Sequence, residues 1–160
     1  MNRGCKYTFL EAKFKLESLC AYQERCSFEL QQKMIKWGVN EANQMILLDH
    51  LISNNYLDEE RFVQTFISGK INIKRWGRIK IRKQLKQKFI SEDLISKNIE
   101  SIDIKVYKEN LINLANKKEF LLKDEIDSYT KKIKIYRFLY SKGYEMDLIK
   151  DCVKRHLNLE

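Results

Sequence analysis

The stretch GKINIKRWGRIKIRKQLKQKF, residues 69–89, concentrates the charged side chains most able to bind a partner. The segment from Lys70 to Lys88 holds nine lysines and arginines and no aspartate or glutamate. Its nine positive charges equal the formal net charge of +9 of the whole chain. The other residues hold 31 − 9 = 22 basic and 22 acidic side chains, so they are electrically balanced. A local field of one sign on a balanced body is typical of a surface that meets a polyanion or an acidic protein.

The alternative is a solvated helix face, but a surface that only keeps a protein soluble normally intersperses both signs. We therefore predict an interaction surface that neutralises phosphates by counterion release or pairs with carboxylates of a protein. Trp76 has two possible roles, on this surface or as a plug against the preceding loop. The candidate binding residues are Lys70, Lys74, Arg75, Trp76, Arg78, Lys80, Arg82, Lys83 and Lys86.

Residues with the spacing of a catalytic or metal site are hard to find. His50 and His156 are isolated, no GxxxxGK phosphate loop occurs, and the cysteines at 5, 20, 26 and 152 form no CxxC pair. We expect no catalysis, no cofactor, no metal and reduced thiols. No apolar run approaches the roughly 18 residues that a membrane span needs, so a cytoplasmic protein without a membrane partner is expected.

The elements that carry this stretch are predicted to be helices. Proline is absent, glycines number five, and apolar residues recur at helical spacing. This pattern predicts about nine helices, and the fifth is expected to run from Arg75 or Trp76 to about Lys88. Ile81 and Leu85 face the core there, and the opposite face carries Trp76, Lys80, Lys83 and Gln87. Asp58 is predicted to cap the fourth helix and to form an ion pair with Arg61.

Part of this pattern repeats three times. LQQKMIKWGVNEA (30–42), IRKQLKQKFISED (81–93) and IYRFLYSKGYEMD (135–147) share apolar first, fifth and tenth positions, with Gly, Phe or Gly at the ninth. The offsets are 51 and 54 residues, and a period near 50 is typical of a repeat architecture. We predict an all-α fold of three tandem three-helix repeats, residues 6–56, 57–102 and 103–160, in an elongated, curved array.

The same residues carry a family resemblance. LDEERF (57–62), WGRIKIRKQLKQKFI (76–90), SFELQQKMIKWGV (27–39) and FLYSKGYEMDLI (138–149) resemble the RecX regulatory proteins in order and spacing, from about residue 12 to 156. Two positions depart from the family pattern. Phe89 stands where glycine is common, which should alter a helix end, and Glu59 replaces the second acid of the usual LDD but keeps its charge.

The resemblance implies three three-helix repeats and a modulator of the bacterial recombinase RecA. It further implies a non-enzymatic protein that lies along the RecA filament on DNA and restrains ATP hydrolysis and strand exchange in recombination and repair. The expected partners are the RecA filament and single- or double-stranded DNA, contacted directly or through RecA, by a monomer. Two other functions stay open: a stand-alone helical DNA-binding protein, and a scaffold whose basic face only keeps it soluble.

Overall fold

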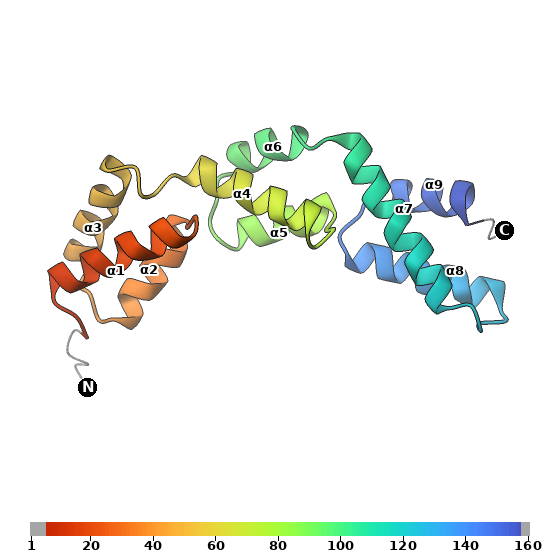
Figure 1. The fold of residues 1–160 in the computed structure, drawn as a ribbon, viewed down its shortest axis with the longest axis horizontal. Coiled ribbons are helices and arrows are strands. Elements are labelled where there is room, and N and C mark those ends of the chain that lie inside the picture. The colour runs from red at the N-terminus through yellow and green to blue at the C-terminus, as the bar shows by residue number, and fades with distance from the viewer. Residues whose placement is uncertain (1–5, 158–160) are drawn as a thin grey trace. The chain divides into compact units, whose positions relative to one another are not determined.

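The structure, a computed structural model, describes residues 6–157. Over these residues the chain forms nine α-helices and no strand, which confirms the predicted all-α class (Figure 1). The helices are α1 (Phe9–Tyr22), α2 (Ser27–Lys36), α3 (Glu41–Ser53), α4 (Glu59–Asn72), α5 (Arg78–Lys86), α6 (Glu92–Glu100), α7 (Ile104–Leu121), α8 (Ser128–Ser141) and α9 (Met146–His156).

The described residues fall into two compact units. One consists of residues 6–65 and 88–90, and the other of residues 66–87 and 91–157, so the division falls within α4. The boundaries predicted after residues 56 and 102 lie in the turns before α4 and before α7. The division into three repeats at these two positions stays a prediction.

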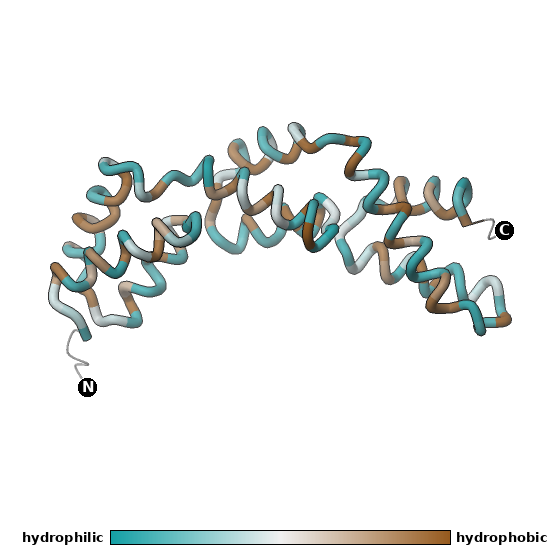
Figure 2. Tube along the Cα trace, in the orientation of Figure 1, coloured by the Kyte–Doolittle hydropathy of each residue, from teal (hydrophilic) through white to brown (hydrophobic). Residues whose placement is uncertain are grey.

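The core of the first unit is built from short apolar stripes on α1, α2 and α3. On α1 the buried side chains are Ala12, Leu16 and Cys20, spaced i, i+4 and i+8 on one helix face. Phe9 and Tyr22 are also apolar but are 42% and 86% exposed, because each lies at an end of α1. Apolar segments alternate with polar ones along every helix in Figure 2, as expected for small bundles.

The repeated sequence element has the same structure in all three copies. Its first and fifth positions are completely buried, which confirms the core assignment of Ile81 and Leu85. Its tenth position is buried as well and follows directly after the turn. The buried sets are Leu30, Met34 and Val39; Ile81, Leu85 and Ile90; and Ile135, Leu139 and Tyr144.

The ninth position of each copy adopts a left-handed backbone, with φ of 76° at Gly38, 58° at Phe89 and 93° at Gly143. This conformation ends a helix and suits glycine, which has no Cβ to clash. Phe89 adopts this conformation too. Its side chain is 78% exposed, and the centre of its ring lies 5.0 Å from the centre of the Phe28 ring. The turn is kept, and α5 ends three residues before Phe89 whereas α2 and α8 end two residues before their glycines.

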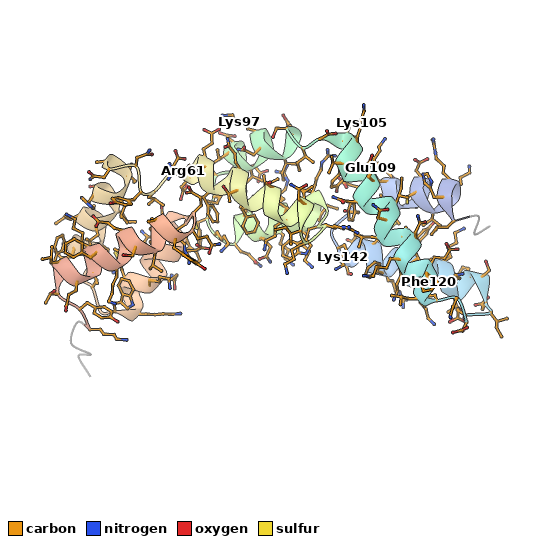
Figure 3. All side chains as sticks on the ribbon, viewed as in Figure 1. Arg61, Lys97, Lys105, Glu109, Phe120 and Lys142 are labelled. Atoms are coloured by element: carbon orange, nitrogen blue, oxygen red, sulfur yellow. The ribbon has the colours of Figure 1, made fainter. Side chains whose placement is uncertain are left out.

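Asp58 caps α4 as predicted, because its Oδ1 accepts a hydrogen bond of 2.9 Å from the backbone N–H of Arg61. The predicted ion pair between these two side chains is wrong. The Arg61 guanidinium instead bonds Glu24 at the end of α1, with Nε to Oε1 at 2.6 Å, and also donates to the Asn55 side chain. Arg61 stands at the start of α4 in Figure 3, where it ties α1 and the α3–α4 turn together.

Candidate partner-binding surface

Helix α5 begins at Arg78, two to three residues later than predicted. Arg75 has a left-handed φ of 51°, and Gly77 is an extended N-cap with φ of −80° and ψ of 162°. A helix cannot pass through these conformations, so Trp76 lies in the turn before α5. The expected placement of Trp76 on the outer face of α5 is therefore wrong.

The first turn of α5 is held by the end of α8. The N–H of Gly77 donates to the Lys142 carbonyl at 2.8 Å, and the N–H of Ile79 donates to the Gly143 carbonyl at 3.0 Å. Amides at a helix N-terminus and carbonyls at a helix C-terminus lack partners within their own helices, so each end satisfies the other. Figure 3 labels Lys142 at this junction, and Figure 1 shows α5 reaching the end of α8.

Another amide of this turn reaches a buried tyrosine. The N–H of Arg78 donates to the Tyr107 hydroxyl at 2.9 Å, and this hydroxyl donates to Glu145 Oε2 at 2.7 Å. The Arg78 guanidinium lies 4.5 Å from the centre of the Tyr107 ring and 3.6 Å from Glu145 Oε1. Burial raises the pKa of Tyr107 well above its usual value, so the hydroxyl stays protonated and keeps its donor role.

Trp76 contacts two lysines of the candidate set. The Nζ atoms of Lys70 and Lys80 lie 4.7 and 4.6 Å from the centre of its ring, within the range of cation–π attraction. Lys80 Nζ also donates to the Ser141 carbonyl at 3.3 Å. Lys80 was predicted on the solvent-facing side of α5, and it is half-buried there, because its side chain lies against the end of α8 and against Trp76.

Acids outside residues 70–88 partly neutralise the basic stretch. Glu92, in the first turn of α6, pairs with Arg82 and, at 2.8 Å, with Lys86. Glu145 pairs with Arg78. In the first unit, Glu29 Oε1 lies 2.5 Å from Lys88 Nζ. The nine cations counted from sequence thus meet three carboxylates, which leaves a net 9 − 3 = 6 positive charges.

The charges still facing solvent are fewer than the candidate set. Lys74, Arg75 and Lys83 are exposed, and their side chains have no ion-pair partner within residues 6–157. The side chain of Lys86 is 57% exposed even though it pairs with Glu92. Lys70, Trp76, Arg78, Lys80 and Arg82 are each partly buried by the contacts above.

A groove of about 620 Å³ runs beside α5 in the second unit. Ile79 and the buried Ile99 supply its apolar surface, and Glu145 lies at its wall. The charge pattern around the groove could not be read from the sequence, because Glu145 is far from residues 70–88 and Glu92, although close along the chain, lies on another helix. The one available signal is that Glu145 occupies the polar eleventh position of the repeat. The cationic lining residues are Arg78, Arg82, Lys83 and Lys86.

Two other kinds of site, a metal centre and a membrane span, are not found within residues 6–157. No group of three or more His, Cys, Asp or Glu side chains there could hold a metal ion. Within the same residues no helix is both long and apolar enough to cross a membrane. Cys20, Cys26 and Cys152 are free and buried, and burial raises the pKa of each thiol, to about 11 for Cys152. Cys5, also expected to be reduced, lies outside the described residues.

Two segments of the chain match models of known three-helix domains. Residues 58–97 match the second three-helix domain of RecX, and residues 106–153 match the third, which together is more than half of the chain. This chain belongs to the RecX family. The basic stretch, residues 70–88, lies entirely within the match to the second of these family domains.

Curated RecX proteins match over most of the chain. "Regulatory protein RecX" of Clostridium botulinum (strain Eklund 17B / Type B) is 38% identical over 133 residues, which is 82% of this chain and 62% of that protein. The one of Clostridium tetani is 30% identical over 156 residues, 97% of this chain and 67% of that protein. The chain thus spans less than two thirds of the length of the first of these relatives.

Solved RecX structures share the fold. The crystal structure of RecX from Lactobacillus salivarius superposes with a TM-score of 0.80 at 18% identity, over 94% of this chain and 97% of that one. A second crystal structure, of regulatory protein RecX, gives a TM-score of 0.78 at 22% identity, over 89% and 71% of the two chains. At 18–22% identity these matches show that the fold is shared, and they do not identify binding residues.

Proposed function

We propose that this RecX-family chain regulates a RecA recombinase by binding the filament that RecA forms on DNA. Binding restrains ATP hydrolysis and strand exchange, and the chain contributes contacts rather than catalysis. The observation that carries the proposal is membership of the RecX family, supported by matches to two of its three-helix domains. The curated relatives from Clostridium botulinum and Clostridium tetani, both called regulatory protein RecX, support it further.

The basic surface supports a binding role of this kind. Lys74 and Lys83 are exposed and free of ion pairs within the described residues, so they are available to carboxylates or phosphates of a filament. Lys80 is a poorer candidate, because its Nζ already bonds the Ser141 carbonyl and contacts Trp76. We assign the partner contact to the exposed cations and a supporting role to the partly buried ones.

The direct test measures DNA-dependent ATP hydrolysis by the cognate RecA while this chain is titrated in. We expect inhibition at amounts well below one copy per RecA subunit. The double variant Lys74→Glu/Lys83→Glu should raise the half-inhibitory concentration about tenfold or more, equivalent to ~1.4 kcal/mol. Its circular dichroism should be unchanged, because both side chains are exposed.

The matched control is Lys117→Glu/Lys150→Glu, which makes the same change in net charge at exposed lysines of α7 and α9. We expect it to inhibit RecA as the parent does. If the chain has no effect on RecA at any ratio, the proposed function is wrong. If the two double variants lose inhibition equally, inhibition depends on the overall net charge of the chain and not on Lys74 and Lys83 in particular.

Stand-alone DNA binding is the competing function, since a short basic helix next to a turn can also dock on a duplex. A protein that only competes for DNA must cover the DNA stoichiometrically and should act whether or not RecA is present. The logarithm of its association constant for DNA should fall as the logarithm of the salt concentration rises, with a slope of up to about one unit for each phosphate contact. Fluorescence anisotropy with labelled DNA in a salt series, without RecA, measures both features.

A further inference from the structure

The groove beside α5 combines positive charge with an aliphatic floor. Arg78, Arg82 and Lys83 line it from α5, and Ile79, 48% exposed, and the buried Ile99 form its apolar surface. All of these residues belong to the second unit. The groove therefore offers two kinds of contact, charge pairing and burial of an aliphatic group, within one site.

The cationic side of the groove already accepts carboxylates. Glu92 pairs with Arg82 and Lys86, and Glu145 pairs with Arg78. Counting these two acids against the four lining cations leaves a net 4 − 2 = 2 positive charges, and Lys83 has no ion-pair partner in the described residues. The exposed ammonium group of Lys83, next to guanidinium groups that already hold carboxylates, favours an additional carboxylate.

The remaining features separate a peptide from a nucleic acid. Bases bind best by stacking on aromatic rings, and the groove lining holds none. Trp76, two residues before Arg78, already contacts the ammonium groups of Lys70 and Lys80. Glu145 at the wall repels phosphates but can accept hydrogen bonds from peptide N–H groups. Ile79 and Ile99 suit an aliphatic side chain, which a peptide supplies and a nucleic acid does not.

We propose that this groove binds an acidic peptide segment of the partner protein, with an aliphatic side chain on Ile79 and Ile99 and flanking carboxylates on the exposed Lys83 and Lys86. The inference deepens the proposed function, because it names the chemistry by which the partner is held. On this basis charge steers the segment to the groove, and burial of the aliphatic side chain provides the specific affinity.

The test uses a short fluorescein-labelled peptide in which aspartates and glutamates flank a central leucine, with anisotropy measured in the absence of RecA and DNA. We expect saturable binding to this chain and about tenfold weaker binding after leucine is changed to serine in the peptide. Ile79→Ser in the protein should weaken binding to a similar degree. The matched control Ile73→Ser alters an isoleucine that is 77% exposed and outside the groove, and should leave affinity unchanged.

The charge contribution is tested with Lys83→Glu, which should weaken the peptide several-fold, against Lys150→Glu, which should not. An oligonucleotide of deoxythymidines is the competing probe. If it binds with sensitivity to Lys83→Glu and indifference to Ile79→Ser while the peptide does not bind, the groove is a phosphate site and the inference is overturned. Equal peptide affinity for the Ile79→Ser and Ile73→Ser variants also overturns it.

Failure of this inference is distinguishable from failure of the proposed function. If the chain inhibits RecA but binds no acidic peptide, the function stands and the groove inference is wrong. If the peptide binds with the expected dependence on Ile79 but RecA is unaffected, the groove inference stands and its partner is another acidic protein.

Discussion

The backbone of Gly143 lies so close to Gly77 that a Cβ atom added at position 77 would meet the Gly143 carbonyl carbon and oxygen at 2.1 Å. Both neighbours are backbone atoms, so no side-chain rotation can relieve such a clash. The contact accompanies the hydrogen bond from the Gly77 N–H to the Lys142 carbonyl. The pair of glycines thus fixes where α5 starts and, with it, the position of the basic side chains on that helix.

Gly77→Ala should therefore lower the free energy of unfolding by about 1–3 kcal/mol, the usual cost of overpacking a tight contact. Urea denaturation followed by circular dichroism measures it. The matched control is Gly69→Ala in α4, where an added Cβ meets nothing within 4 Å. Alanine at this helical position should stabilise by about 0.5–1 kcal/mol. Equal effects of the two changes would show that the close approach at Gly77 is not maintained in solution.

Lys80 and Lys83, three residues apart on α5, should differ in their contribution to stability. Lys80→Ala removes the hydrogen bond to the Ser141 carbonyl and the contact with Trp76, and should cost about 1–2 kcal/mol. Lys83→Ala, at an exposed position without an ion pair among the described residues, should change stability by less than about 0.5 kcal/mol. Thermal unfolding of both variants tests this. The reverse order would mean that Lys83 is the packed side chain.

Phe89 allows backbone strain and ring contact to be measured separately. Phe89→Ala keeps a Cβ at a φ of 58° and loses the contact with Phe28, so it should destabilise by about 0.5–1 kcal/mol. Phe89→Gly loses the same ring but removes the strain, worth about 1–2 kcal/mol for a left-handed residue. We expect the glycine variant to be about 1 kcal/mol more stable than the alanine variant in chemical denaturation. A less stable glycine variant would contradict the left-handed turn.

Stability should fall at alkaline pH. Burial raises the pKa of Cys152 from 9.0 to about 11, and it raises the pKa values of Tyr107 and Tyr144 well above the usual tyrosine value. As pH rises through about 9, the unfolded chain loses these protons before the folded chain does, so the free energy of unfolding decreases. Thermal midpoints measured from pH 7 to about 10.5 should therefore decline, and Cys152→Ala should reduce the slope. A flat profile would exclude burial of these groups.

The sequence by itself determined the helical class and the repeated element, because both depend on local spacing. Apolar pairs four residues apart must share a helix face, and Ile81 and Leu85 are completely buried as that rule requires. A glycine after an amphipathic run ends a helix in the left-handed conformation, as at Gly38 and Gly143. The location of the cationic stretch was likewise evident, since net charge is a property of composition.

Only the tertiary structure decided which of those cations are available. Glu92 lies close to the stretch along the chain, but Glu145 does not, and both pair with its arginines because packing of α6 and α9 brings their first turns or caps beside α5. Lys80 is half-buried because α8 ends next to it, and its Nζ donates to the Ser141 carbonyl. Spacing along one helix specifies which residues share a face, but it carries no information about what a distant segment places against that face. The structure thereby leaves Lys74, Arg75 and Lys83, rather than all nine cations, as the exposed charges that have no ion pair among the described residues.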